Sequence, residues 1–225
     1  MHRVIVPDNF PRSVTAFFTG KTPGADLDEV SSMTGISKTH IYMPVQKHTD
    51  KVLMLDARRE PSIADAVVTN EKGILIGVQV ADCVPLLLYD PRKNAAAAIH
   101  AGWRGTAAAI LKKTLNVMMN RFSCDPVDIL VAIGPSIRGC CYAVGPEVIA
   151  AIARSTGQAA YRLVQQGKHC IDLAVANRDQ ALSMNIPEAN IWLSRDCTFC
   201  NPEQYFSYRC ARGSTGRQAA FIAVR

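Results

Sequence analysis

Residues 74–101, ILIGVQVADCVPLLLYDPRKNAAAAIHA, decide the fold of this chain. They contain three nearly continuous apolar runs, Ile74–Val80, Val84–Tyr89 and Ala96–His100, separated by short polar breaks. Runs of this length without apolar–polar alternation are typical of strands that are covered on both faces. The segment therefore predicts the buried centre of a sheet, with Cys83 in a break between two strands and His100 at the end of the third.

The rest of the chain predicts more short strands and a few helices. Because the strands and helices do not alternate regularly, the pattern favours an α+β fold over a doubly wound α/β fold. The apolar spacing, a first-turn proline and a capping aspartate predict helices over Thr106–Arg121, Pro146–Arg154 and Asp172–Met184. The further predicted strands are Val14–Thr19, His40–Val45, Val52–Leu55, Ala66–Thr69, Ile129–Ile133, Ile191–Leu193, Tyr205–Tyr208 and Ala219–Val224.

Composition limits the class of protein. A chain of 225 residues with 48% apolar and 20% charged residues fits one globular domain, so we expect a single catalytic domain over residues 1–225. No apolar run reaches 18 residues and the N-terminus lacks an apolar signal core, which predicts a cytoplasmic protein. The net charge is +6, but the basic residues occur singly or in pairs, so we expect no nucleic-acid partner and no membrane partner.

One thiol and two imidazoles form a candidate metal site. Cys83 and His100 lie at predicted strand ends, and His48 lies in the turn after the strand His40–Val45. Cysteine and histidine are ligands that Zn²⁺ or copper prefers, and three protein ligands leave one coordination position open for water or substrate. The sequence separations are not those of a local ligand motif, so spacing alone leaves open whether the three side chains meet.

Basic groups near this trio could bind an anion. Arg104 lies in the Gly-Trp-Arg-Gly turn at the start of a predicted helix, and both the guanidinium and the helix N-terminus suit phosphate. Ser136 and Arg138 in the loop of residues 134–139 are a second candidate phosphate site. Asp82 could accept a hydrogen bond from a ligand imidazole or, equally well, cap its own turn.

These segments resemble the YfiH or laccase-domain family, which is described both as polyphenol oxidase and as purine nucleoside phosphorylase. The resemblance extends from residue 45 to the C-terminus, and the HAGWRG and ADCVP segments carry most of it. The matching segments are VQKH at 45–48, ADCVP at 81–85, IHAGWRG at 99–105, AIGPSI at 132–137, CCYAVGPEV at 140–148, CT at 197–198, FSYR at 206–209 and TGR at 215–217.

The resemblance implies a four-layer α/β/β/α fold of mixed sheets and a Zn²⁺ site formed by His48, Cys83 and His100. It also implies phosphorolysis of adenosine, inosine and methylthioadenosine, with deamination of adenosine as a further activity. Purine nucleosides and phosphate are then the partners, and we expect a monomer or a weak homo-oligomer. Cys83, His48, His100 and Arg104 are the catalytic candidates. A metal with these ligands would lower the pKa of bound water, which suits deamination at purine C6.

The chain departs from the family pattern at its beginning. Residues 18–24 read FTGKTPG where the family has a Thr-Arg-x-Gly-Gly loop, and the region that follows is short. Lys21 could replace the missing positive charge but not the two parallel hydrogen bonds of an arginine. Thr49 stands where the family usually has glycine after the first histidine.

Three other functions remain open from the sequence. Cys83 with a histidine could be a thiolate nucleophile and its base, which would make the protein a metal-independent cysteine hydrolase. A copper-dependent polyphenol oxidase (laccase-like) is a second alternative, although five histidines are few for a multicopper cluster. An RNA-binding or scaffold protein is the third, and it would need exposed aromatic residues among the basic ones.

The chain has eight cysteines, and most of them have no predicted role. Cys197 and Cys200, with Cys210 beyond, could form a zinc knuckle or a redox pair, but a second Cys-x-x-Cys motif is absent. We therefore expect structural roles for these residues. The adjacent pair Cys140 and Cys141 is expected on a loop near the site, with no chemistry of its own.

Overall fold

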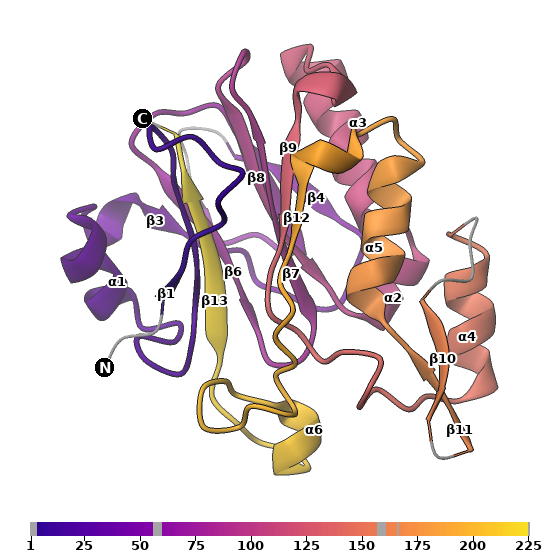
Figure 1. The fold of residues 1–225 in the computed structure, drawn as a ribbon. Helices are drawn as coiled ribbons and strands as arrows, with labels where there is room; N and C mark the ends of the chain where they lie inside the picture. Colours follow the sequence, from indigo (N-terminus) through magenta and orange to yellow (C-terminus); the bar gives the residue numbers. More distant parts are fainter. Residues whose placement is uncertain (1–3, 56–59, 157–160, 166, 225) are drawn as a thin grey trace.

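The computed structural model describes residues 4–55, 60–156, 161–165 and 167–224 (Figure 1). Two sheets form the centre of the molecule: one has the strand order β12-β9-β7-β8-β5-β4 and the other the order β1-β2-β13-β6-β3. The first comprises β4 (Val52–Met54), β5 (Ala66–Thr69), β7 (Val84–Asp90), β8 (Ala95–Ala101), β9 (Leu130–Ile133) and β12 (Ile191–Leu193). The second comprises β1 (Val4–Ile5), β2 (Thr15–Thr19), β3 (Ile41–Tyr42), β6 (Leu75–Val80) and β13 (Gln218–Ala223).

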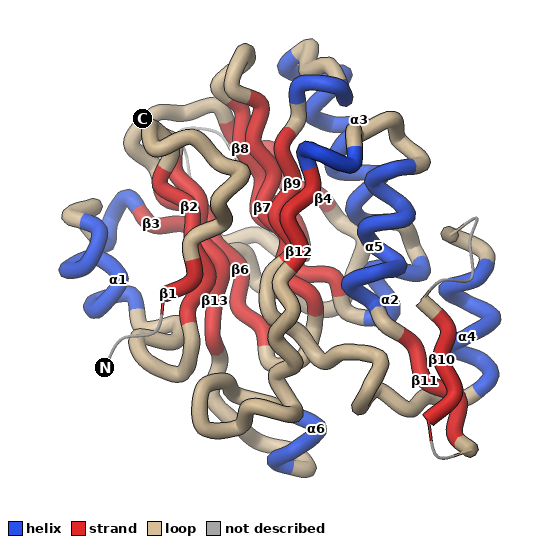
Figure 2. The backbone as a smooth tube through the Cα atoms, viewed as in Figure 1, coloured by secondary structure: helices blue, strands red, loops and turns tan. Residues whose placement is uncertain are grey.

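Helices cover the outer face of each sheet (Figures 1 and 2). On the six-stranded sheet lie α2, α3 and α5, with α4 packed against α2 further out, while α1 covers the five-stranded sheet. The helices and 3₁₀ turns are α1 (Leu27–Thr34), η1 (Lys38–His40), α2 (Trp103–Ala107), α3 (Ile110–Phe122), η2 (Pro126–Asp128), α4 (Pro146–Ala153), α5 (Leu173–Leu182), η3 (Glu188–Asn190) and α6 (Tyr208–Ala211). A separate hairpin is formed by β10 (Arg162–Gln165) and β11 (Lys168–Ile171).

The continuous apolar strands explain the layering. In β7, Leu86 and Leu88 face the helices, whereas Leu87 and Tyr89 face the second sheet, because successive side chains point to opposite sides. A third cluster, which includes Val30 and Phe221, lies between α1 and the outer face of the five-stranded sheet. Helices, sheet, sheet and helix therefore form four layers, which confirms the expected α+β fold of α/β/β/α type with mixed sheets.

Strand pairing places two of the candidate ligands. Strands β7 and β8 are antiparallel neighbours, with Val84 opposite Ala101 and Pro85 opposite His100. Cys83 immediately precedes β7, so the pairing brings it to the same end of the hairpin as His100. The buried, extensively paired centre of the sheet thereby supports the candidate site.

Several elements differ from the sequence predictions. The helix predicted over Thr106–Arg121 is two helices, because Ala109 adopts a left-handed conformation (φ 58°) between α2 and α3. The predicted strand Tyr205–Tyr208 is wrong: Ser207 caps α6 by accepting a hydrogen bond from the N–H of Cys210. Finally, α1 and the β10–β11 hairpin were not predicted. None of the helices in the described part of the chain is long and apolar enough to cross a membrane.

Candidate active site

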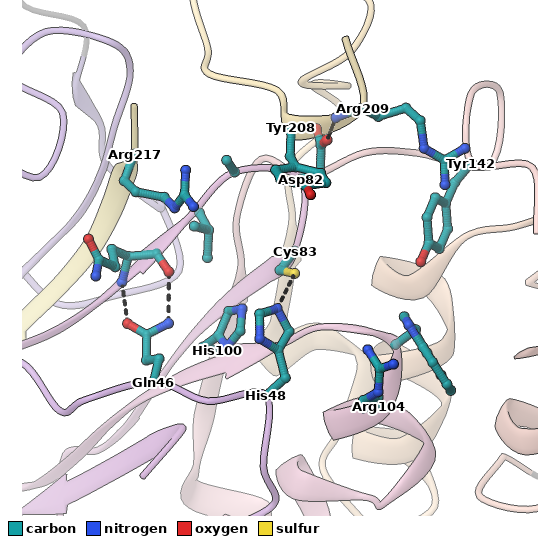
Figure 3. A pocket seen from close by; sticks show the side chains of 14 residues that line it. Gln46, His48, Asp82, Cys83, His100, Arg104, Tyr142, Tyr208, Arg209 and Arg217 are labelled. Carbon is teal, nitrogen blue, oxygen red and sulfur yellow. Dashed lines mark hydrogen bonds between the residues drawn. The ribbon is translucent and has the colours of Figure 1, made fainter. Parts of the chain in front are cut away.

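His48, Cys83 and His100 meet at the end of the β7–β8 hairpin (Figure 3). His48 comes from the loop before β4, Cys83 from the turn between β6 and β7, and His100 from β8. The Sγ atom of Cys83 lies 3.8 Å from Nε2 of His48, and one ligand atom from each residue lies within 4.8 Å of the others. The structure thus brings together three side chains whose sequence separation left their proximity open.

The trio lies at the boundary between core and solvent. His100 is only 4% exposed, Cys83 is half-buried and His48 is exposed. The two imidazole rings meet edge to face, with centroids 4.7 Å apart and an interplanar angle of 80°. Gly102 permits this approach: a Cβ atom there would lie 3.0 Å from both the sulfur of Cys83 and the ring of His48. One side of the trio is therefore held by the sheet, and the other faces solvent.

Asp65 organises the loop that carries His48 and orients the ring of His100. Its fully buried carboxylate accepts hydrogen bonds from the backbone N–H groups of Lys47, His48 and Thr49, at 3.2, 3.0 and 2.6 Å. The Thr49 hydroxyl donates to it at 2.7 Å, and Nδ1 of His100 lies 2.7 Å from Oδ1. Because Nδ1 of His100 is engaged in this way, Nε2 is left to face Cys83 and any bound ion.

Asp65 was not singled out in the sequence, although a signal was present. It is a charged residue immediately before β5, whose four residues are all buried. A carboxylate at that position must be compensated by several donors, and such groups are frequently functional. The departure at Thr49 also has a structural role, because a glycine would lack the hydroxyl that binds Asp65.

The electrostatics of the trio favour a thiolate. Burial alone raises the pKa of Cys83, but the imidazoles of His100 and His48 outweigh it and hold that pKa at about 6. Burial alone lowers the pKa of His100, whereas Cys83 and Asp65 together raise it to about 9. For Asp65, burial raises the pKa, but the hydrogen bonds from His100 and Thr49 hold it below its usual range. These mutual interactions favour the thiolate form of Cys83.

The donor set fits one borderline-soft metal ion. A tetrahedral ion with ordinary Zn–S and Zn–N bonds separates sulfur from nitrogen by about 3.5 Å, and the Cys83–His48 distance is 3.8 Å. The thiolate and two imidazoles match the ligands of zinc or copper, and the Asp65–His100 contact is the outer support that such histidines usually have. His48, Cys83 and His100 can thus bind a metal ion, with one position left toward solvent.

A cavity of about 550 Å³ opens directly over the trio (Figure 3). Three arginines, Arg104, Arg209 and Arg217, line it. Arg104 stacks on the Trp103 ring at 4.4 Å, and Arg209 lies over the Tyr142 ring at 5.1 Å. Within the described residues none of the three forms an ion pair with a carboxylate. The cavity is therefore suited to an anionic ligand.

Tyr142 adds a hydroxyl to the cavity wall. Burial, together with the negative charge of Cys83, raises the pKa of Tyr142 to about 12. The hydroxyl is consequently protonated at neutral pH and can donate a hydrogen bond. Tyr142, Arg209 and Arg217 lie in the family segments CCYAVGPEV, FSYR and TGR, where the sequence predicts no role for them, and only the folded chain places them on one cavity.

Asp82 anchors a distant segment of chain. Its carboxylate accepts hydrogen bonds from the hydroxyls of Thr198 (2.6 Å) and Ser207 (3.0 Å) and from the N–H of Arg209 (2.7 Å). These contacts match neither of the two roles considered for Asp82, because its partners lie far along the chain and not in its own turn. The hydrogen-bonding role toward a ligand imidazole belongs to Asp65.

The second candidate phosphate site lies away from the cavity. Ser136 is fully buried, and its Oγ has no hydrogen-bond partner in the described structure. The Arg138 side chain donates to Asp172 at 2.9 Å and to the carbonyl of Ser194. Neither Ser136 nor Arg138 lines the cavity. The hydrogen bonds of the Arg138 side chain instead connect neighbouring loops. Lys21 lies over the ring of Phe206, 5.4 Å from its centroid, and also does not line the cavity.

Comparisons with known proteins agree with the architecture. The family described as "Multi-copper polyphenol oxidoreductase laccase" matches residues 25–225. The chain belongs to this laccase family. The match includes all three candidate ligands and every arginine of the cavity, and it confirms the family resemblance of the sequence.

Individual relatives within the laccase family carry the names of enzymes. The chain is 38% identical over 207 residues to a purine nucleoside phosphorylase of Bacteroides thetaiotaomicron, covering 85% of this chain and 77% of the relative. It is 36% identical over 197 residues to adenosine deaminase RL5 of an unknown prokaryotic organism, covering 81% and 74%. The crystal structure of YlmD from Geobacillus stearothermophilus superposes with a TM-score of 0.89 at 27% identity, covering 97% of this chain and 94% of that one. These relatives support the expectation of an enzyme.

Proposed function

We propose that this protein is a zinc-dependent purine nucleoside phosphorylase that acts on adenosine, inosine and methylthioadenosine. The observation that carries the proposal is the position of the cavity, which has three guanidinium groups, none ion-paired with a carboxylate among the described residues, beside the cysteine and the two imidazoles of the trio. Its volume of about 550 Å³ is in the range of small-molecule sites. The names of the relatives, a purine nucleoside phosphorylase and an adenosine deaminase, support purine nucleosides as the substrate class.

Phosphorolysis requires that the protein hold phosphate beside the nucleoside. Arg104, Arg209 and Arg217 supply fork-shaped donors that match phosphate oxygens, and Arg104 is oriented by its stacking on Trp103. The N-terminus of α2, which was expected to help bind phosphate, contributes less than that of a longer helix would, because α2 is only five residues long. The protonated Tyr142 hydroxyl can donate to a heteroatom of the nucleoside. These groups would orient phosphate toward C1′ while the purine leaves.

His48, Cys83 and His100 would hold the zinc ion. A bound Zn²⁺ supplies Lewis acidity, which suits both a developing negative charge on the nucleoside and the activation of water. The chain's own contribution is to fix the ligands: Asp65 orients His100 and the His48 loop, and the sheet fixes Cys83. Adenosine deamination is a second candidate activity, favoured by the likeness to adenosine deaminase RL5.

Copper-dependent phenol oxidation, which the family description names, is the main alternative. Multicopper chemistry uses histidine-rich clusters, whereas the candidate ligands here are two histidines and one cysteine. The other described histidines, His40 in η1 and His169 in β11, do not line the cavity. This distribution of histidines supports a single metal ion at the cavity, and it favours purine nucleoside chemistry over phenol oxidation by a multicopper cluster.

The decisive test combines metal analysis with an assay of the untreated protein. We expect zinc in elemental analysis and release of adenine from adenosine that depends on inorganic phosphate. Formation of inosine and ammonia without phosphate would support the second activity. Copper in place of zinc, together with oxidation of phenols and no release of adenine, would overturn the proposal.

Arg104→Ala is expected to raise the KM for phosphate about 10- to 100-fold, because one charge-assisted contact is lost. Steady-state kinetics with varied phosphate measure the change, and elemental analysis should find unchanged zinc. Deamination needs no phosphate, so its rate should fall much less. Arg121→Ala, at an exposed position in the last turn of α3, is the matched control. Loss of zinc from Arg104→Ala would instead assign Arg104 a structural role.

A further inference from the structure

A second group of sulfur atoms lies outside the candidate active site. This four-cysteine cluster has ligand atoms that all lie within 4.8 Å of one another. The shortest separations described in it are 3.2 Å between Cys141 and Cys200 and 3.8 Å between Cys140 and Cys200. The cluster consists of Cys140, Cys141, Cys197 and Cys200.

We propose that the four-cysteine cluster binds a structural Zn²⁺ ion. Tetrahedral coordination with ordinary Zn–S bonds places each pair of sulfurs about 3.8 Å apart, close to the separations in the cluster. Four sulfurs within mutual reach fit one shared ion better than a disulfide, which joins two sulfurs at about 2.05 Å and leaves the others out. Four sulfur ligands with no open position are characteristic of structural zinc sites.

The backbone around the cluster is arranged for a metal-bound thiolate. The N–H of Arg138 donates a hydrogen bond to the sulfur of Cys197, with a donor–acceptor distance of 3.4 Å. The Cys197–Cys200 turn is closed by the N–H of Asn201, which donates to the carbonyl of Cys197 at 3.2 Å. A closed Cys-x-x-Cys turn and a backbone donor to sulfur orient two ligands before the ion arrives. Binding would form four Zn–S bonds and release the thiol protons to solvent, without electron transfer.

The sequence suggested the wrong partners for Cys197 and Cys200. The absence of a second Cys-x-x-Cys argued against a zinc site, and Cys210 was the residue considered as a third member. In the structure Cys210 lies in α6, outside the cluster, and the adjacent cysteines 140 and 141 complete it. The other three cysteines are also outside it: Cys83 is in the active site, and Cys124 and Cys170 are buried elsewhere.

The ion would join two loops that support the active site. Tyr142, which directly follows Cys141, lines the cavity. Thr198, which directly follows Cys197, donates its hydroxyl to Asp82 at 2.6 Å, and its N–H to the carbonyl of Ser136 at 3.1 Å. The cluster therefore joins the loop after β9 to the loop after β12. The inferred role is to hold the cavity wall in place, and it does not depend on which reaction the cavity performs.

The test uses a Cys83→Ser background, which disables the active-site trio whatever its function. The reduced, metal-free protein is incubated with Zn²⁺, freed of excess metal, and examined by elemental analysis and native mass spectrometry. We expect one zinc per chain in Cys83→Ser and none in Cys83→Ser/Cys200→Ser. Cobalt substitution of the first variant should give the intense sulfur-to-metal absorption of a four-thiolate site. Cys200 is exposed, so its replacement leaves the core intact, which circular dichroism checks.

The matched control is Cys83→Ser/Cys210→Ser, which replaces an exposed cysteine outside the cluster and should retain one zinc. The proposal is overturned if Cys83→Ser binds no zinc, or if Cys83→Ser/Cys200→Ser retains it. A disulfide between Cys141 and Cys200 would lower the mass of the chain by two hydrogens in protein purified without reductant. The proposal is equally overturned if mass spectrometry finds this loss and the protein takes up no zinc after reduction. Failure of the phosphorylase assay would leave each of these readouts unchanged.

Discussion

Cys83→Ser should leave the protein with one zinc fewer per chain and lower kcat/KM for phosphorolysis of adenosine about 1,000-fold, while the fold persists. A serine hydroxyl does not ionise near neutral pH, so the site would keep only its two imidazoles and would lose the charge that attracts the ion. A factor of 1,000 corresponds to about 4 kcal/mol of lost transition-state stabilisation. Elemental analysis, the phosphate-dependent assay and circular dichroism measure the three quantities.

Cys210→Ser is the control for the Cys83 variant, because Cys210 is an exposed cysteine outside both cysteine-containing sites. It should keep full zinc and full activity. Undiminished phosphorolysis by Cys83→Ser protein that has lost this zinc would refute the role of the zinc in catalysis, and unchanged zinc in Cys83→Ser would refute Cys83 as a ligand. Rapid alkylation of Cys83 in an active protein that lacks zinc at this site would favour the cysteine hydrolase instead.

Asp65→Asn should weaken zinc binding at the trio about 10- to 100-fold and lower the free energy of unfolding by about 2–4 kcal/mol. The carboxylate accepts from four donors in the His48 loop and contacts His100, whereas an asparagine turns an NH₂ group toward some of those donors. Competition with a chelator measures zinc affinity, and denaturant unfolding of the metal-free protein measures stability.

Asp50→Asn is the control for Asp65→Asn, since Asp50 lies in the same loop but is partly exposed and pairs with Lys113 at the surface. Its replacement should change zinc affinity very little. Thr49→Val, which removes a single hydroxyl donor to Asp65, should give a smaller loss than Asp65→Asn and remains informative if that variant folds poorly. Equal zinc affinity in all three variants would show that Asp65 does not support the ligands.

The centre of the fold could be predicted from the sequence, because strands that are buried on both faces appear as continuous apolar runs. The predicted segments Val84–Tyr89 and Ile191–Leu193 nearly coincide with β7 and β12. The break at Ala109 could not be predicted from the sequence, since alanine favours helices, yet this residue adopts a left-handed conformation. The segment Tyr205–Tyr208 alternates like a strand, yet its buried Ser207 donates a hydrogen bond to Asp82 and caps α6.

The site was predictable only in part, for a similar reason. Polar groups at the ends of apolar strands and in the turn after one of them drew attention to Cys83, His100 and His48, and the family resemblance implied that the three bind one ion. The local Gly-Trp-Arg-Gly turn pointed to Arg104, but the places of Asp65, Arg209 and Arg217 depend on contacts between segments far apart in the chain, which no local pattern contains. Cys140 and Cys141 were assigned no chemistry because their partners lie 56 or more positions further on.

The two ends of the β7–β8 hairpin differ in how freely their residues can change: one end carries metal-ligand candidates, and the other is an exposed turn. Its register sets Pro85 opposite His100 at one end, while residues 91–94 form the turn at the other end, where 91–93 are exposed. An inserted epitope, a longer connection or a proteolytic nick at that turn should not change the spacing of Cys83 and His100, because the paired strands set that spacing. The turn is therefore a natural place to attach a reporter or a tether to this protein without disturbing its chemistry.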